Sequence, residues 1–274
     1  MLASHSQISF LPETAFIRKY IVKNKLQKWI AELGVANALK MIKEDEVLSR
    51  INFELPTLGE NSSDVADLDY YIALQQQGMT ASGKTRFGDK DPRLIEYLPT
   101  LHNCFPKAYV VNIVRDPRDV LSSKKKAAWS AGRSTIFYAF ANRVQLKLAR
   151  KLGSKLFGKQ YIEIVYEDLI KDPENELKSL CGKLEINYEN SLLNFGKQAK
   201  KLVSKEEESW KKETFGPLLS NNADKWKKQL NAREVALTEL SCVDAFNIGN
   251  YKRADAIKLK RKKWKLTMVF LPQK

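Results

Sequence analysis

Hydrophobic positions along the chain follow two patterns, one typical of helices and one of buried strands. Across residues 14–50 apolar side chains recur at roughly helical spacing, with lysine and glutamate between them. The same spacing predicts further helices at about 65–77, 94–101, 120–152 and 172–184, and a last major element starting at 224–230. Short runs rich in β-branched residues, at 109–114 and 161–166, are instead typical of buried strands. Strands that alternate with helices predict an α/β fold with a parallel sheet covered on both faces.

Turn-forming residues separate these segments without dividing the chain into several units. Pro56, Gly59 and the Asn-Ser-Ser run at 61–63 mark a loop, and 78–92 is rich in small, polar and turn residues. Gly132 is a candidate interruption of the helix that contains it. No internal repeat or strong linker is present, and 274 residues suffice for one large α/β domain.

Composition narrows the class of protein. No run approaches the roughly 18 apolar residues of a membrane span, and the start of the chain shows no signal-peptide pattern. Cys104, Cys181 and Cys242 are widely spaced and form no C-x-x-C, so neither a disulfide framework nor a zinc site is indicated. We therefore expect a reduced, cytoplasmic protein without a metal.

A formal net charge of +15 makes anionic partners the expectation. Residues 252–274 hold nine Lys or Arg and one Asp, a net charge of +8, with a tryptophan and aliphatic residues interleaved. Such a segment can lie on an anionic bilayer, which would make this a peripheral membrane protein; the alternative is a solvated extension packed partly on the domain. A non-catalytic protein that binds anionic surfaces is a further alternative, and no specific nucleic-acid partner is expected.

The most informative stretch is a strand, turn and helix start at 109–123. The apolar run ends at Arg115, a turn follows, and Asp119 opens the predicted helix that carries Ser123. A guanidinium, helix N-terminal amides and hydroxyls beyond a buried strand suit a phosphate. The alternative is that Arg115 forms a salt bridge with Asp116 or Asp119.

This stretch resembles the 3′-phosphate-binding segment of the sulfotransferase family, in which an Arg ends a strand and a Ser follows eight positions later. The resemblance implies that Arg115 and Ser123 bind the 3′-phosphate of the sulfuryl donor, 3′-phosphoadenosine 5′-phosphosulfate (PAPS). It also implies a P-loop-type three-layer α/β fold with a parallel central sheet and a helical acceptor-binding cap.

Two further segments resemble those of tyrosylprotein and related bacterial sulfotransferases. Residues 86–92 resemble a strand and Lys-x-Pro segment in which the Lys stabilises the departing phosphate, a role that falls to Lys90. Residues 2–14 end in Glu-Thr, where the Glu is the general base for the acceptor hydroxyl, a role that falls to Glu13. A solvated Lys90, and a Glu13 that complements the dipole of the next helix, are the alternatives.

Two more segments resemble parts of the family that lie near the adenine end of the donor. Tyr166, in Tyr-Glu-Asp-Leu, would lie near the adenine, and Ser220 and Lys225 belong to a late loop, 217–226, that closes over the nucleotide. The resemblance covers about residues 1–251, which we take as one sulfotransferase-like domain followed by the basic extension 252–274. The family's 5′-phosphosulfate loop would lie just upstream of Met1, so the domain is expected to be N-terminally truncated and, as 274 residues, poorly active.

A competing motif lies at 78–85, where Gly-Met-Thr-Ala-Ser-Gly-Lys-Thr satisfies the Walker A pattern. That motif binds phosphates only when a buried strand enters it and a helix leaves it. Here an amphipathic helical pattern precedes it, and Gly88 and Pro92 follow. We therefore favour transfer of a sulfuryl group from PAPS to a hydroxyl of a carbohydrate, lipid, peptide or small molecule over an NTPase or kinase.

Overall fold

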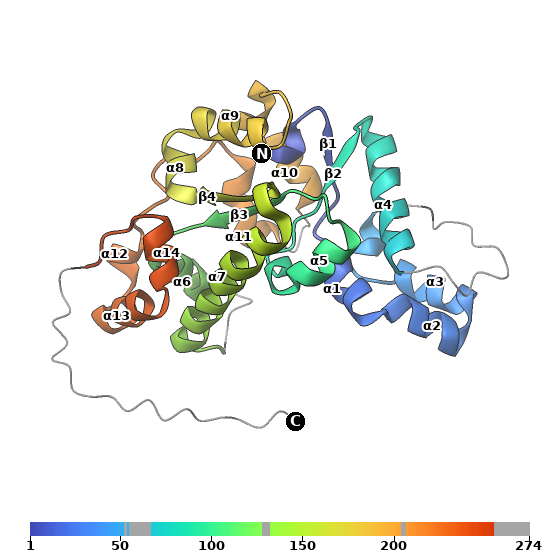
Figure 1. Ribbon diagram of the computed structural model, residues 1–274, viewed down its shortest axis with the longest axis horizontal. Coiled ribbons are helices and arrows are strands. Elements are labelled where there is room, and N and C mark those ends of the chain that lie inside the picture. Colours follow the sequence, from blue (N-terminus) through green and yellow to red (C-terminus); the bar gives the residue numbers. More distant parts are fainter. Residues whose placement is uncertain (52–53, 55–66, 128–131, 204–206, 255–274) are drawn as a thin grey trace.

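The protein is described by a computed structural model over residues 1–51, 54, 67–127, 132–203 and 207–254 (Figure 1). The predicted loop at 56–63, and all but the first three residues of the basic extension, lie outside the described residues. None of the described helices is long and apolar enough to cross a membrane.

Four short strands form two parallel pairs. β1 (Ile8–Phe10) pairs with β2 (Arg86–Gly88), and β3 (Val110–Val114) pairs with β4 (Tyr161–Val165). The two strands predicted from β-branched runs are confirmed to within one residue, and the parallel direction is confirmed for both pairs. In Figure 1 both pairs lie in the middle of the molecule, β3 and β4 to the left of β1 and β2.

The two pairs do not continue into one another, since no ladder joins β2 to β3 in the described part of the chain. A cavity of about 720 Å³ lies between them, lined by Phe87 and Gly88 on one side and by Tyr109 and Val111 on the other. The rest of its lining is largely apolar and includes Leu94, Leu101 and Phe105.

The remaining elements are helical. The α-helices are α1 Phe16–Lys19, α2 Lys25–Leu33, α3 Val35–Lys43, α4 Asp67–Ser82, α5 Leu98–Cys104, α6 Pro117–Lys126, α7 Thr135–Phe157, α8 Tyr166–Lys171, α9 Pro173–Lys183, α10 Gly196–Leu202, α11 Glu208–Lys211, α12 Trp226–Gln229, α13 Ala232–Ser241 and α14 Val243–Ile248. The 3₁₀ turns are η1 Leu2–Ser4, η2 Ile21–Lys23, η3 Leu48–Arg50, η4 Leu94–Tyr97, η6 Gly158–Gln160, η7 Asn190–Leu193 and η8 Lys212–Phe215.

Helices pack against both faces of the β3–β4 pair. On one face, Val114 of β3 is buried with Leu146 of α7 and Ala245 of α14. On the other face, Ile162 and Ile164 of β4 pack with buried leucines of α8 and α9, namely Leu169, Leu177 and Leu180. This arrangement is the layered α/β fold that the alternation of strands and helices predicts.

The segment 14–50 is not one helix but a series of short ones. Asn24 and Gly34 adopt positive φ values of 47° and 78°, which interrupt the helical backbone before α2 and before α3. Asp67 of α4 accepts hydrogen bonds of 3.0 Å from the backbone amides of Leu26 and Gln27, which satisfies donors in the first turn of α2. These helices and α4 share a core that includes Phe16, Tyr20, Ile42, Leu48, Tyr71 and Leu74.

The predicted helical stretch 120–152 is two helices, α6 and α7. Pro117 occupies the first turn of α6, and the Asp116 side chain caps it by accepting from the Arg118 amide. Gly132, with φ of 87°, lies between the helices, and Ser134 caps α7. The interruption at Gly132 is thus confirmed.

A buried arginine joins the end of β3 to the C-terminal helices. The Arg118 side chain is 4% exposed and forms ion pairs with Asp116 at 2.7 Å and with Glu239 of α13 at 2.8 Å. Its guanidinium lies 3.9 Å from the ring centre of Trp226 and 4.9 Å from that of Phe246. One cation therefore holds three C-terminal helices, α12, α13 and α14, against α6.

The Walker-like string lies in the wrong structural context for binding phosphates. The helix α4 enters it and the strand β2 follows it, the reverse of the order that the motif requires. The Lys84 ammonium donates to the backbone oxygens of Ala3, at 2.8 Å, and Ile8, at 2.9 Å. Burial lowers the pKa of Lys84. Lys84 therefore tethers the N-terminal segment to β2.

We expect Lys84→Ala to destabilise the fold without changing nucleotide binding. Two charge-assisted hydrogen bonds are lost, which should cost about 1.5–3 kcal/mol in the free energy of unfolding. Urea denaturation followed by circular dichroism measures the first effect, and calorimetric titration with ATP the second. Loss of ATP binding by the folded variant would restore the NTPase alternative.

Two glycine-to-alanine changes should shift stability in opposite directions. A Cβ at Gly153 of α7 would overlap the ring of Tyr161, whose hydroxyl is hydrogen-bonded to Asn112 and Glu163 at 3.0 Å each. Because the ring cannot move freely, Gly153→Ala should lower the free energy of unfolding by about 1–3 kcal/mol. Gly182→Ala, in α9 with open space around it, should raise it by up to about 1 kcal/mol. Chemical denaturation of both variants checks the signs.

Candidate active site

The predicted base and the predicted cation are in direct contact. Glu13 follows β1 and Lys90 follows β2, and since the two strands are parallel neighbours, both side chains emerge at the same edge. The Lys90 ammonium donates to the Glu13 carboxylate. The ammonium of Lys211, in α11, lies 3.9 Å from the same carboxylate. A carboxylate and two cations thus form one polar cluster.

Carboxylates on either side of Lys90 anchor the loop that carries it. Asp89 accepts from the hydroxyl of Tyr71 at 3.0 Å and from the Lys90 amide at 2.7 Å, and burial raises the pKa of Asp89. The Asp91 side chain, 1% exposed, accepts from Arg18 at 2.9 Å. Because Arg18 belongs to α1, just after Glu13, this ion pair ties together the two loops that carry Glu13 and Lys90.

The alternative role of Glu13 as a charge at the start of the next helix does not match its position. Thr14 accepts from the Phe16 amide at 3.2 Å, and α1 has no acidic residue in its first turn. Ala15, with φ of 52°, turns the backbone between Glu13 and the helix. The Glu13 side chain is therefore left to interact with Lys90.

A second cluster forms beyond β3 around Arg115. Its guanidinium lies 4.5 Å from the ring centre of Tyr166, at the start of α8, and donates to the backbone oxygen of Asn222 at 2.7 Å. The Asn222 side chain in turn donates to the Tyr166 hydroxyl at 2.7 Å. The structure thus brings together two predicted residues, Arg115 and Tyr166, with the late loop at 217–226.

The alternative of a salt bridge between Arg115 and its neighbours is not found among the described residues. Asp116 is paired with Arg118, and Asp119 accepts from the backbone amides of Asp224, at 2.7 Å, and Trp226, at 2.8 Å. Burial raises the pKa of Asp119. The Nε of Arg115 is buried and has no hydrogen-bond partner in the described part of the chain. A donor in that state fits an anionic ligand, such as a phosphate.

The other predicted donor-binding residues do not join this cluster. Ser123 is exposed on α6, and Ser220 is exposed beside a cavity of about 840 Å³ that Glu167 and Tyr251 also line. The Lys225 ammonium lies 3.5 Å from Glu213. Within the described residues, none of these three has a hydrogen bond or ion pair with Arg115 or Tyr166.

Two residues of the clusters were missed by sequence reasoning. Asn222 lies in the late loop, 217–226, in which the sequence pointed to Ser220 and Lys225 instead. Lys211 lies in a lysine- and glutamate-rich stretch in which no residue stands out. Only the fold shows that this lysine approaches Glu13.

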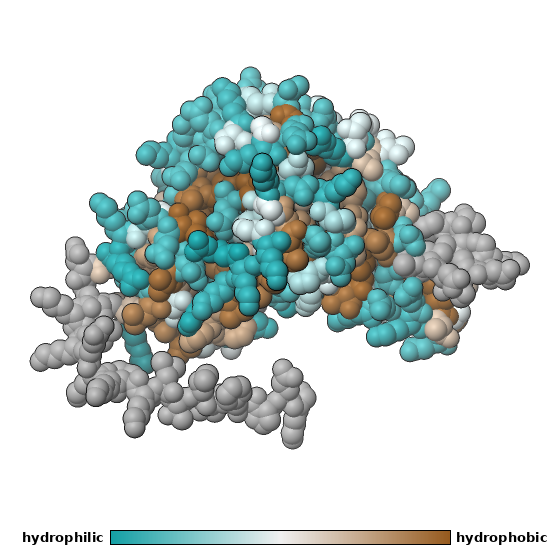
Figure 2. Space-filling model, in the orientation of Figure 1, coloured by the Kyte–Doolittle hydropathy of each residue, from teal (hydrophilic) through white to brown (hydrophobic). Residues whose placement is uncertain are grey.

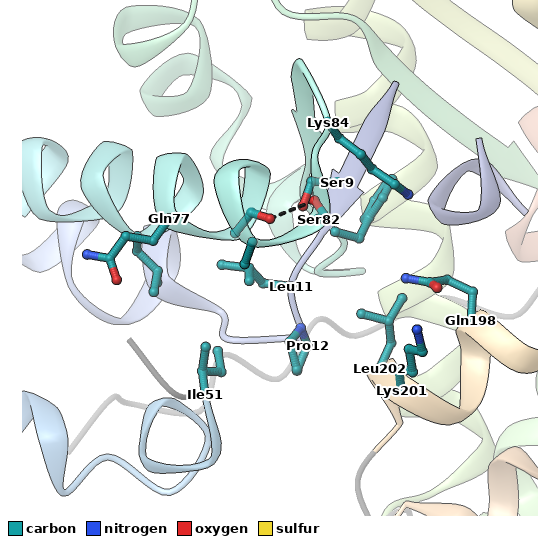
Figure 3. A pocket seen from close by; sticks show the side chains of 14 residues that line it. Ser9, Leu11, Pro12, Ile51, Gln77, Ser82, Lys84, Gln198, Lys201 and Leu202 are labelled. Atoms are coloured by element: carbon teal, nitrogen blue, oxygen red, sulfur yellow. Dashed lines mark hydrogen bonds between the residues drawn. The ribbon is translucent and has the colours of Figure 1, made fainter. Parts of the chain in front are cut away.

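A cleft opens beside Glu13. It consists of a cavity of about 520 Å³ and one of about 820 Å³, both lined by Pro12, Lys201 and Leu202. In Figure 3, which shows the smaller cavity, Leu11, Pro12 and Ile51 face Lys201 and Leu202 of α10 across the open space. The larger cavity reaches Glu13, and its other polar lining is of mixed sign, including Arg18, Lys19, Glu46, Arg50 and Glu207.

No group of three or more His, Cys, Asp or Glu side chains that could hold a metal occurs in the residues that the structure covers. His5 is buried, and its ring lies 2.8 Å from the backbone oxygen of Asn187 and accepts from the Gln7 amide at 3.0 Å. His102 faces the ring of Phe157, with ring centres 5.3 Å apart. Both histidines have structural neighbours and neither lies in the Glu13 cluster.

Comparison with known proteins gives partial sequence matches. The chain is 27% identical over 114 residues to a putative protein-tyrosine sulfotransferase of Caenorhabditis briggsae, a match covering 39% of this chain and 40% of that protein. It is 27% identical over 118 residues to an uncharacterized protein of Aquifex aeolicus, covering 41% of this chain and 16% of that protein. These matches thus span less than half of either relative.

Solved structures match over nearly the whole chain. The sulfotransferase domain of the Synechococcus PCC 7002 olefin synthase aligns with a TM-score of 0.60 and 20% identity, covering 92% of this chain and 88% of that one. The sulfotransferase domain of the curacin biosynthetic pathway aligns with a TM-score of 0.56 and 19% identity, covering 92% of each chain. At these identities the likeness establishes the fold.

A family model described as "Sulfotransferase family" matches residues 1–190. The matched range contains β1 to β4 with Glu13, Lys90, Arg115 and Tyr166. Since it covers most of the chain, and the fold agrees with it, the chain belongs to the sulfotransferase family.

Proposed function

We propose that the protein transfers a sulfuryl group from PAPS to an acceptor hydroxyl. The observation that carries this proposal is the contact between Glu13 and Lys90, which come from the ends of two parallel strands. A carboxylate and an ammonium side by side at a strand edge supply the two charges that the reaction needs, one to accept a proton and one to stabilise a departing phosphate.

In this scheme Glu13 takes the proton of the acceptor hydroxyl as the acceptor oxygen forms its bond to sulfur. The bond between sulfur and the bridging oxygen of the 5′-phosphate breaks, and Lys90 stabilises the negative charge that this oxygen gains. The products are the sulfated acceptor and 3′-phosphoadenosine 5′-phosphate. The chemistry is mainly positioning and charge stabilisation, as in phosphoryl transfer, and the scheme uses no metal.

The donor's 3′-phosphate would be bound by Arg115. Its Nε is buried and has no hydrogen-bond partner among the described residues, which supports this assignment because a phosphate oxygen would satisfy that donor. Tyr166, stacked on the guanidinium, would border the adenine. Ser123, Ser220 and Lys225 are proposed as further contacts to the nucleotide, reached from α6 and from the late loop.

The acceptor would enter the cleft beside Glu13. A carbohydrate, lipid, peptide or small molecule could supply the hydroxyl, and the name of the nematode relative makes a tyrosine the first acceptor to test. We further propose that residues 1–251 act as one domain with 252–274 as an extension.

Three free cysteines suit a reducing compartment, which supports a cytoplasmic location.

Arg115→Ala should weaken binding of 3′-phosphoadenosine 5′-phosphate much more than binding of adenosine 5′-phosphate. The loss of a charge-assisted contact should cost about 1.5–3 kcal/mol, which is tenfold or more in the dissociation constant. Calorimetric titration with both nucleotides gives the comparison, and Arg233→Ala, exposed on α13, is the control. Equal losses for the two nucleotides would refute the assignment of the 3′-phosphate.

Glu13→Gln and Lys90→Ala should each lower turnover while donor binding is largely retained, because both groups act at the reacting centre. For Glu13→Gln the expected loss is about 10²–10⁴-fold. A radiolabelled-sulfate transfer assay over an acceptor panel that includes tyrosine peptides measures it, on the 274-residue chain and on a form extended upstream in the same reading frame.

The matched control is Glu176→Gln with Lys183→Ala, both on α9, away from the cleft. Turnover of the Glu13 and Lys90 variants within twofold of the unsubstituted protein would contradict the proposed roles. Equal losses in the control would mean that the assay reports folding instead of chemistry.

A further inference from the structure

The longest helix of the described chain, α7, leaves an apolar stripe open to solvent. Ile136, Phe137, Phe140 and Val144 are 52%, 46%, 41% and 51% exposed. Their spacing of one, three and four residues puts them on one side of the helix. Single exposed apolar residues need no explanation, but four large ones on adjacent turns form a patch that does.

Neighbouring helices extend this patch. Leu240 of α13 and Val243 of α14 are 66% and 41% exposed. Cys242 lies between these two residues, where α13 meets α14, and its thiol donates to the backbone oxygen of Ala139 at 3.5 Å. The junction of α13 and α14 therefore lies beside the first turns of α7. In Figure 2 apolar side chains gather at the lower left, around α13 and the lower end of α7, and hydrophilic ones cover the rest of that helix.

The same side of α7 becomes basic toward its C-terminal end. Lys147 and Lys151 are exposed and continue the spacing of Phe140 and Val144. The helix carries five Lys or Arg and has no Asp or Glu among its 23 residues. At its start, the guanidinium of Arg133 lies 4.8 Å from the ring centre of Phe137. Apolar and cationic groups thus share one surface, which we call the α7 face.

We propose that the α7 face, formed by Ile136, Phe137, Phe140, Val144, Lys147 and Lys151 with Leu240 and Val243, docks on an anionic lipid bilayer. Aromatic and aliphatic side chains can enter the boundary between headgroups and acyl chains, while lysines on the same side meet anionic headgroups. The absence of any acidic residue from α7 favours a uniformly negative surface over a protein partner of mixed charge. None of these residues belongs to the basic extension 252–274, and the proposal does not depend on sulfuryl transfer.

Co-sedimentation of the full chain with vesicles tests the proposal. The protein should bind vesicles of phosphatidylcholine with added phosphatidylserine more strongly than phosphatidylcholine alone, and high salt should weaken the binding. Phe137→Ser with Phe140→Ser and Val144→Ser should reduce the bound fraction about tenfold or more, because the inserted apolar area is lost. All three side chains are exposed, so the fold should persist, as circular dichroism can verify.

A charge-matched pair of variants separates the α7 face from general electrostatic attraction. Lys147→Glu with Lys151→Glu should lose binding, whereas Lys171→Glu with Lys183→Glu, on helices that cover the opposite face of β4, should retain most of it. Both double variants have the same net charge and the same C-terminal extension. Equal effects of the two pairs, undiminished binding of the serine variant, or no binding by the unsubstituted protein would each overturn the proposal.

Discussion

The ion pairs of Arg118 hold together the half of the molecule that carries the Arg115 cluster. A guanidinium with 4% of its side chain exposed needs partners, and it finds two carboxylates and two aromatic rings in elements far apart in sequence. Asp119, one residue further along α6, binds the backbone amides at the start of α12. These contacts set the path of the late loop, and the loop then reaches Arg115 and Tyr166 through Asn222. The geometry around Arg115 therefore depends on the buried charges of Arg118 and Asp119 in α6.

The Glu13 cluster depends on a different constraint, the parallel direction of β1 and β2. Parallel neighbours need a long crossover, and here that crossover is the helical cap, α1 to α4. The cap has two structural roles. It connects β1 to β2, and it supplies Tyr71 and Arg18, which hydrogen-bond the carboxylates on either side of Lys90. The open cleft at Glu13 lies against the same helices, so the shape of the cleft and the position of the Glu13 side chain depend on the same packing.

Elements that leave a local pattern in the sequence could be predicted, whereas contacts between residues far apart in the sequence could not. β3 and β4 were predicted because strands of five residues, four of them apolar in each, leave a clear pattern, whereas β1 and β2, with three residues each, do not, and β2 was expected only from the family resemblance. The breaks at Asn24 and Gly34 were missed because helical spacing continues across them. Glu13 and Lys90 were chosen from family resemblance, and Arg115 from its place at the end of a buried strand as well. The pairing of Glu13 with Lys90, the approach of Lys211 and the position of Arg115 over the ring of Tyr166 depend on the fold. The Walker-like string was rejected from its flanking residues, and the helix before it confirms that reasoning.

The separation of the strands into two pairs has a consequence for the order of folding. Each pair closes within its own stretch of chain, residues 8–88 for the first and 110–165 for the second. Parallel pairing must wait for its crossover, so each closure carries a large entropic cost and is slow. We expect the N-terminal stretch to complete its pairing during synthesis before the second pair is made, with α5 as the link between two successive cooperative units.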